Sequence, residues 1–323
     1  MINLGYTLSS EQHRPNTLVA NGQRAEAAGF EFLSISDHFH PWLDAQGQAP
    51  FVWSTLGGLA QATSTIRVGT GVTCPTIRIH PVIVAQAVAS VADMFEGRFF
   101  FGIGSGENLN EHITGQHWPP ISVRQDMLRE AVGLIRKLWQ GEYTTEHGRF
   151  YTVENARIYT VPETLPEIIV AAAGPEAAVM AAEIGDGIDT TSPTPDVIQM
   201  FERHGGKGPR YGQMAVCYGP DEQAARELAL KQWGFAGVPG QLKQELALPL
   251  YFEQAAQLVT PDQIGESVVC GPDPERYHQE IRKFADAGFT HLYILQIGQD
   301  QASFIDFAER ELLPAYRGVA TPA

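Results

Sequence analysis

Short β-branched or aromatic runs alternate with amphipathic stretches along the whole chain of 323 residues. This alternation is typical of repeated strand–helix units whose strands lie parallel in one sheet. Eight segments are predicted as strands: 2–7, 30–36, 66–73, 98–104, 167–172, 187–191, 214–218 and 290–297. The helices expected between them include residues 15–28, 81–95, 122–140, 175–184, 221–233 and 274–287.

Three junctions from helix to strand share one chemistry. Gly29, Gly185 and Gly288 each stand where a helix would end in a left-handed residue, and an apolar strand follows at once. The first and last junctions also share Ala-Gly-Phe, followed three residues later by Leu33 or Leu292. Because the same unit recurs at both ends, we predict an α/β fold closed on itself, a (β/α)8 barrel of the TIM type.

Two stretches interrupt the alternation. Residues 142–161 have the polar turns and alternating Tyr, Phe and Thr of an inserted hairpin, and residues 234–260 form an insertion before the eighth strand. No linker divides the chain, so we expect residues 1–323 to form one barrel domain. In such barrels the functional groups lie at the carboxyl ends of the strands.

Composition narrows the possible partners. The chain carries 22 Lys and Arg against 37 Asp and Glu, a net charge of −15, which disfavours nucleic acid or an anionic membrane as a partner. It has no apolar run of the roughly 20 residues that span a bilayer, and no basic residue precedes Arg14. We therefore expect neither a transmembrane helix nor a signal peptide.

The cysteines indicate the compartment. Cys74, Cys217 and Cys270 are odd in number and far apart, which fits neither a disulfide framework nor a zinc site. A reducing cytoplasm is the expected location. Cys217 lies within a predicted strand, where packing is its expected role.

The second predicted strand ends in an abrupt change from apolar to ionisable residues, Asp37-His38-Phe39-His40-Pro41-Trp42. One interpretation is structural, with Asp37 capping the next segment and His38 packed. A second is a metal site that uses His38 and His40, but such sites need further ligands at later strand ends. The fifth, sixth and eighth strands supply no histidine there, so we expect no metal.

Glycines surround the ends of the fourth and fifth strands. Gly102, Gly104 and Gly106 remove side chains where a planar ligand could approach the backbone, and Glu107 follows directly. The pattern is not the dinucleotide fingerprint. The fifth strand ends in Ala173-Gly174-Pro175 and opens a helix, which is either an ordinary tight turn or a place for an anionic ligand group.

Together these motifs resemble a known family. The segments Ser36 to Trp42, Gly104 to Glu111, Ala172 to Pro175 and Gly185 to Gly187 are similar to those of the luciferase-like flavin and deazaflavin barrels. Within that superfamily the chain most resembles the glucose-6-phosphate dehydrogenases that use coenzyme F-420, and the similarity spans nearly the whole chain.

The resemblance implies a site for the deazaflavin. A non-prolyl cis peptide in the third strand, around Gly71 and Val72, would press against its ring. Cys74 stands where the close relatives have Thr, so one hydrogen bond is expected to differ. The cofactor-contact positions are Asp37, Gly71, Val72, Cys74, Gly104, Ser105, Gly106, Asn110, Ala172, Ala173 and Gly174.

The resemblance also implies the chemistry. His38, Trp42 and Glu107 match the family's catalytic positions, and Glu11 matches a further acidic group. Oxidising a carbinol sends hydride to the deazaflavin and releases a proton from oxygen. His38 is the expected general base, Glu107 the expected proton donor or hydrogen-bond partner of the ring, and these two roles remain exchangeable. Trp42 is expected to wall the pocket and hold the developing carbonyl.

Phosphate recognition departs from the family. Thr191 and Lys243 match two of four phosphate ligands, but Thr194 and Ser267 replace a Lys and an Arg. Two lost cations remove charge-assisted bonds of about 1.5 to 3 kcal/mol each. Arg203, Lys207 or Arg210 would have to restore the charge. The leading hypothesis is a dehydrogenase of a sugar or sugar phosphate, and a secondary alcohol is the next candidate.

Three other functions stay open. They are a reductase that passes hydride to an imine or enone, a flavin mononucleotide monooxygenase, and a non-catalytic flavin-binding protein. Trp118 begins a segment expected to cover the barrel mouth. Family members are commonly homodimers, which is the expected assembly here.

Overall fold

Eight parallel strands close into a barrel, which confirms the predicted fold class. The computed structural model describes residues 2–238 and 241–316. Neighbouring strands follow the chain order, and β1 pairs with both β2 and β11 to close the ring. The strands are β1 Asn3–Leu8, β2 Phe32–Ile35, β3 Arg67–Thr70, β4 Phe99–Ile103, β7 Glu167–Ala171, β8 Gly187–Thr190, β9 Arg210–Cys217 and β11 His291–Gln296.

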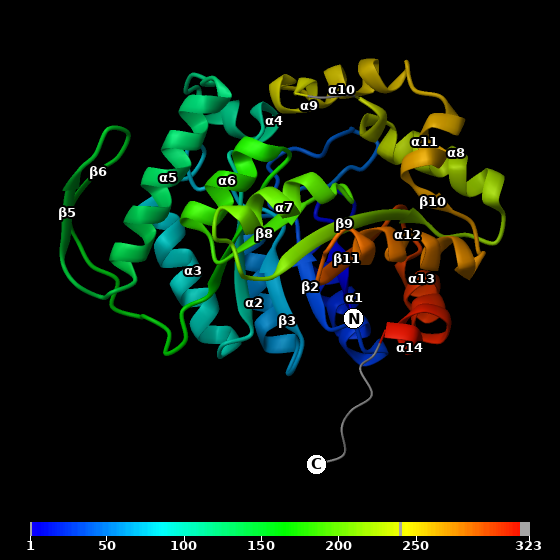
Figure 1. Cartoon of the computed structure of the whole chain (residues 1–323), viewed down its shortest axis with the longest axis horizontal. Coiled ribbons are helices and arrows are strands. Elements are labelled where there is room, and N and C mark those ends of the chain that lie inside the picture. Colours follow the sequence, from blue (N-terminus) through cyan, green and yellow to red (C-terminus); the bar gives the residue numbers. More distant parts are fainter. Residues whose placement is uncertain (1, 239–240, 317–323) are drawn as a thin grey trace, which may run out of the picture.

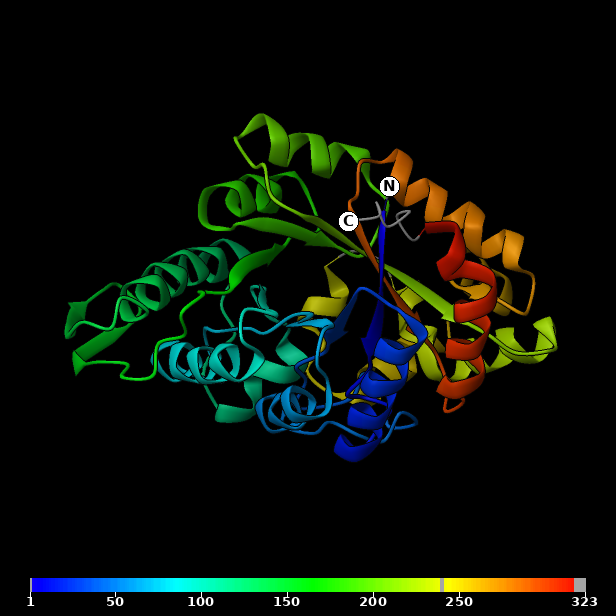
Figure 2. The ribbon, with the colours of Figure 1, turned by 90° about the horizontal axis from the view of Figure 1, so that it is seen from below.

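Helices surround this barrel, from the blue α1 through the green α5 to the red α13 in Figure 2. Five of the six expected helices have the predicted bounds to within one residue, and α5 differs by up to two. The helices around the strands are α1 Pro15–Ala28, α2 Val52–Ala62, α3 Pro81–Phe95, α4 Asn108–Glu111, α5 Ile121–Leu138, α6 Pro175–Ile184, α7 Pro195–Arg203, α8 Glu222–Trp233, α12 Pro274–Asp286, α13 Gln301–Phe307 and α14 Leu313–Tyr316.

The predicted left-handed conformation is confirmed at two of the three glycines and is wrong at the third. Gly29 and Gly288 are left-handed, with φ of 91° and 95°, and each closes its helix through its N–H. Gly185 is extended, with φ of −100°. A Cβ there would come within 2.7 Å of Val170 and 2.8 Å of the Ala181 carbonyl oxygen, so close packing is the reason for this glycine.

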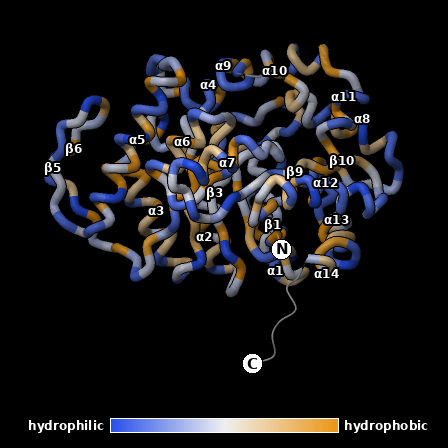
Figure 3. Tube along the Cα trace, in the orientation of Figure 1, coloured by the Kyte–Doolittle hydropathy of each residue, from blue (hydrophilic) through white to orange (hydrophobic). Residues whose placement is uncertain are grey.

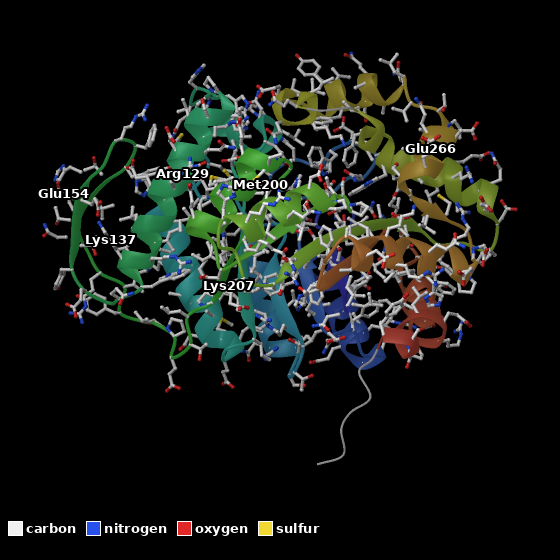
Figure 4. The ribbon with its side chains drawn as sticks, in the orientation of Figure 1. Arg129, Lys137, Glu154, Met200, Lys207 and Glu266 are labelled. Atoms are coloured by element: carbon white, nitrogen blue, oxygen red, sulfur yellow. The ribbon has the colours of Figure 1, made fainter. Side chains whose placement is uncertain are left out.

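The insertions differ from each other in kind. Residues 142–161 contain the predicted hairpin, β5 Thr144–His147 and β6 Thr152–Ala156, which projects at the left of Figure 1 and carries Glu154 in Figure 4. The second insertion is helical, with a 3-10 turn at Gly234–Gly237, α9 Leu242–Glu245 and α10 Pro249–Ala256. Its residues 239–240 lie outside the described residues. The chain returns through α11 Pro261–Ser267 and β10 Val269–Cys270, which pairs with β9.

Apolar side chains fill both the space under the helices and the barrel interior. Hydrophobic residues make up most of the strands and of the helix faces that pack on them, whereas the hairpin is mostly hydrophilic (Figure 3). Inside the barrel, five large side chains form a separate cluster: Phe32, Phe100, Ile169, Tyr211 and Tyr293. Gly5 and Gly69 leave room for two of these rings, because a Cβ would lie 2.5 Å from Phe32 or 2.3 Å from Phe100. The barrel is therefore packed rather than hollow.

One carboxyl group is buried above this cluster. The hydroxyl of Tyr293 donates to Asp189, at 2.7 and 2.9 Å from its two oxygens. Burial raises the pKa of Asp189 to about 7, although the hydrogen bond from Tyr293 opposes the shift. Because the folded state holds this proton more tightly than the unfolded state, Asp189 lowers stability as the pH rises from about 4 to about 7.

We therefore predict that Asp189→Asn gains thermal stability over the wild type as the pH rises from 4.5 to 7.5. The neutral amide releases no proton on unfolding, so the difference in Tm should widen with pH and then level off. Thermal unfolding followed by circular dichroism measures it, with the exposed Asp196→Asn as control. A difference that stays constant with pH would contradict the prediction.

Candidate active site

Three ionisable side chains meet where β1, β2 and β4 end. Nε2 of His38 lies 3.5 Å from Oε1 of Glu11 and 3.7 Å from Oε2 of Glu107. Glu11 comes from the loop after β1, His38 from the loop after β2 and Glu107 from the loop after β4. Barrel closure therefore brings together residues that are up to 96 positions apart.

Hydrogen bonds orient the imidazole. Nδ1 of His38 lies 3.1 Å from the backbone oxygen of His40, which can only accept, and 3.2 Å from the side-chain N–H group of Asn110, which can only donate, so either tautomer finds a partner there. In the tautomer with its proton on Nδ1, Nε2 presents its lone pair to the two carboxyl groups. Asn110 supports the same loop, since its Oδ1 accepts from the backbone N–H groups of Phe39 and His40.

Glu107 and Glu11 differ in their access to solvent. The Glu107 side chain is 32% exposed, whereas that of Glu11 is 3% exposed. Loss of solvation raises the pKa of Glu107, opposed mainly by His38 and also by the hydrogen bond from Asn110. A carboxyl group with a raised pKa is suited to donating a proton near neutral pH.

Trp42 packs beside His38. Its ring lies 5.0 Å from the His38 ring and stacks on Phe235 at 4.6 Å, with Phe252 packed edge-on. Phe235 and Phe252 belong to the helical insertion. The wall of the site is therefore shared between the β2 loop and the insertion.

The insertion is fastened to the β4 loop by Arg124 of α5. This fully buried guanidinium lies over the Trp118 ring at 3.9 Å and donates to the Gly106 oxygen at 3.3 Å. It also pairs with Glu245 of α9 at 3.4 Å, and Trp118 donates to the same carboxylate at 3.0 Å. Sequence reasoning missed Arg124, although it lies at helical spacing from the buried Leu128, where an apolar residue would be expected.

A second buried network lies under the strand ends. Asp37 accepts from Thr73 and from Arg78, both at 2.8 Å. Arg78 also reaches Glu111, whose other oxygen accepts from the Arg78 backbone N–H at 2.7 Å. Burial raises the pKa of Glu111 to about 7, against the opposing effect of Arg78. Neither Arg78 nor Glu111 was assigned a role from the sequence.

Glycines bring the loops after β3 and β4 into close contact. The peptide bond between Gly71 and Val72 is cis, as the family resemblance implied. A Cβ on Gly104 would lie 2.9 Å from Val72, and one on Gly106, whose φ is 82°, would lie 2.7 Å from the sulfur of Cys74. Cys74 also contacts the hydroxyl of Thr76 at 3.0 Å. The glycines therefore allow the two loops to pack closely against each other, and no larger residue fits at either position.

The other predicted cofactor positions lie at the neighbouring strand ends. Ala172, Ala173 and Gly174 follow β7, and Gly174 precedes the first residue of α6. Ser105 is half-buried on the β4 loop between Gly104 and Gly106. The arrangement thus places every predicted cofactor-contact residue at the carboxyl end of the barrel.

The proposed phosphate ligands are sparse. Thr191 and Thr194 are exposed between β8 and α7, and Ser267 ends α11. The ammonium of Lys243 donates to the Ala236 oxygen at 3.0 Å. Burial lowers the pKa of Lys243, and Glu107 opposes that shift.

Three cationic residues were candidates for replacing the missing phosphate ligands, but they lie at the amino end of the barrel. Arg203 ends α7, Lys207 follows it (labelled in Figure 4), and Arg210 begins β9. The start of β9 is at the amino end of the barrel, away from His38. Arg210 is moreover paired with Glu202 at 2.6 Å.

Among residues 2–238 and 241–316, no group of three or more His, Cys, Asp or Glu side chains is arranged to hold a metal ion. No described helix is long and apolar enough to cross a membrane.

A closed parallel barrel with ionisable groups gathered at the carboxyl ends of its strands is the architecture of barrel enzymes. Residues 2–291 match the luciferase-like monooxygenase family, and the chain belongs to that family. It is 34% identical, over 98% of both chains, to the F-420-dependent glucose-6-phosphate dehydrogenase of Beutenbergia cavernae.

Solved structures agree with this placement. An F-420-dependent secondary alcohol dehydrogenase in complex with an F-420–acetone adduct is 32% identical, with a TM-score of 0.92 over 98% of this chain and 100% of that one. The coenzyme F-420-dependent tetrahydromethanopterin reductase of Methanopyrus kandleri has a TM-score of 0.78 at 21% identity, over 98% of this chain and 99% of that one, which shows a shared fold.

The buried network yields a prediction about stability. Arg78→Met leaves Asp37 and Glu111 buried without their cation, so unfolding free energy should fall by about 3–5 kcal/mol. Urea unfolding measures this loss. Arg129→Met is the matched control, because its pairs with Asp126 and Glu183 are exposed and should contribute about 1 kcal/mol or less. Equal losses in the two variants would contradict the prediction.

Proposed function

We propose that this chain is a coenzyme F-420-dependent dehydrogenase that oxidises a CH–OH group. The observation that carries the proposal is the position of His38 Nε2 between Glu11 and Glu107, beside Trp42. The names of the relatives, dehydrogenases that depend on this coenzyme, support the cofactor and the reaction class.

The residues present fit the deazaflavin. The cis peptide at Gly71 and Val72 and the neighbouring loop with Gly104 and Gly106 would contact the ring. Asp37, Cys74, Ser105, Asn110 and the Ala172 to Gly174 turn would hold the rest. When bound, the deazaflavin supplies a two-electron acceptor whose C5 takes the hydride from the carbinol carbon.

Side chains of the protein would accept the hydroxyl proton of the substrate and donate a proton or a hydrogen bond to the ring. As the carbinol becomes a carbonyl, its hydroxyl proton must leave, and Nε2 of His38 would accept it in the tautomer that carries its proton on Nδ1. Glu107, with its raised pKa and partial exposure, would donate a proton or a hydrogen bond to the ring. Trp42 would orient the substrate against His38.

We propose a neutral hydroxyl compound as substrate, either an unphosphorylated sugar or a secondary alcohol. A phosphate dianion would find Lys243 as its sole matching cation, next to Glu107, while Arg203, Lys207 and Arg210 belong to the opposite end of the barrel. The structural relative with an acetone adduct supports this choice. Glucose 6-phosphate is the second candidate, because the curated relatives are named for it.

Other reactions of the fold have distinguishing tests. Oxygen consumption with reduced flavin mononucleotide and an aldehyde would indicate a monooxygenase. Oxidation of the reduced deazaflavin by an imine or enone would indicate a reductase. Binding without any turnover would indicate a cofactor-binding protein.

The roles of His38 and Glu107 give the next prediction. His38→Ala and Glu107→Gln should each lower kcat at least about 100-fold, because each removes a positioned proton-transfer group. Affinity for coenzyme F-420, measured by quenching of tryptophan fluorescence, should change less than about threefold if these groups act on the reaction rather than on binding. Full turnover in both variants, or tighter binding of flavin mononucleotide than of coenzyme F-420, would contradict the proposal.

The substrate choice is tested by steady-state rates. We expect kcat/KM for glucose or 2-propanol to exceed that for glucose 6-phosphate, because the site lacks two of the cations that would hold the phosphate. Deazaflavin absorbance follows each reaction. Restoring a cation through Thr194→Lys should raise kcat/KM for glucose 6-phosphate and leave 2-propanol nearly unchanged. A higher value for glucose 6-phosphate in the wild type would favour the second candidate.

A further inference from the structure

Two serine hydroxyls hold Glu11 on the side that faces away from His38. The hydroxyls of Ser9 and Ser36 both donate to Oε2 of Glu11, each at 2.8 Å. The other oxygen, Oε1, is the one that lies 3.5 Å from Nε2 of His38. One edge of the carboxylate is thus occupied by the protein, and the other is left for the imidazole.

The direction of the Ser36 bond is fixed by its neighbour. The backbone N–H of Ser10 donates to the Ser36 hydroxyl oxygen at 2.9 Å. Because that oxygen already accepts one hydrogen, its own hydrogen is directed at Glu11. Both serines are buried, so water does not compete for these bonds. A buried carboxylate that accepts two hydroxyl hydrogens is held in one orientation and stabilised in its charged form.

His38 is the basic residue that pairs with Glu11. Among residues 2–238 and 241–316, it is the one basic side chain within ion-pair distance of Glu11. His13 faces Glu11 from the same loop, and burial lowers its pKa, which favours the neutral ring. Glu107 faces His38 from the opposite side, and Lys243 faces Glu107 from the insertion.

We propose that Ser36 and Ser9 are positioning residues for proton removal: they fix the Glu11 carboxylate against Nε2 of His38, so that the imidazole can accept the substrate's hydroxyl proton. This inference rests on the proposed dehydrogenase function. The proton passes from the substrate oxygen to Nε2, the O–H electron pair forms the carbonyl, and the hydride leaves with the deazaflavin as acceptor. Glu11 stays an anion and stabilises the imidazolium that results.

The test begins with Ser36→Ala and Ser9→Ala. Each removes one hydrogen bond to a charged group, so kcat should fall about 10-fold or more, while KM and the affinity for coenzyme F-420 change less than about threefold. Ser36→Thr, which keeps the hydroxyl, should recover most of the rate. Ser10→Ala is the matched control, because its hydroxyl bonds to the Ser36 backbone oxygen at 2.7 Å and not to Glu11.

The pH profile separates positioning from a merely structural role. The serine hydroxyls stabilise the Glu11–His38 pair in its deprotonated, active form. Without them the pair takes up a proton at a higher pH than in the wild type, so the acid limb of kcat/KM should move to higher pH by about half a unit or more. Loss of packing alone would lower the rate equally at every pH. An acid limb that does not move in the Ser9→Ala, Ser36→Ala double variant would overturn the inference.

A double-mutant cycle gives an independent check. In the Glu11→Gln background there is no carboxylate to fix, so adding Ser36→Ala should change kcat less than about twofold. If Ser36→Ala cost the same factor in both backgrounds, Ser36 would act without Glu11 and the inference would fail. Wild-type enzyme that never reduces the deazaflavin with any alcohol or sugar would instead refute the proposed function, which is a separate result.

Discussion

One guanidinium, that of Arg78, neutralises two carboxylates buried under the mouth of the barrel. It binds Asp37 from the loop after β2 and Glu111 from the loop after β4, and its own backbone follows Cys74 in the segment after β3. Two buried negative charges without a cation would repel each other and lack solvation. Three consecutive strand ends are therefore tied to one another. His38 and the glycine cradle, which is formed by Gly104 and Gly106, lie on the loops that are fixed in this way.

A second set of contacts, around His38, lies beside this buried Arg78 network and is more exposed to solvent. Glu11 and His38 lie on the loops after β1 and β2, whereas Trp42 packs against Phe235 and Phe252 of the helical insertion and Glu107 faces Lys243 of its α9. Arg124 connects the loop after β4 with the helical insertion, since it binds the Gly106 oxygen on that loop and Glu245 on the insertion.

Prediction of the fold succeeded because its signals are local. Strand–helix alternation and left-handed glycines at Gly29 and Gly288 arise from the period of apolar residues and from backbone sterics. Prediction failed where distant packing decides the conformation. Gly185 is extended, and it is a glycine because Val170 and a helix carbonyl leave no room for a Cβ. The strand that contains Cys217 begins four residues earlier than expected because β8 and β11 supply partners for Arg210 to Gly212.

The sequence by itself determined which residues end each strand, and so which side chains could belong to the site: His38, Trp42, Glu107 and the glycines of the cradle. Only the tertiary structure decided how they combine. The pairing of Glu11 with His38, the two serines behind it, and the roles of Arg78 and Arg124 each depend on contacts between loops far apart in the chain. The placing of Arg203, Lys207 and Arg210 at the opposite end from the site was also decided there. A local pattern fixes the type of element, but a distance between two side chains depends on how the closed barrel positions both.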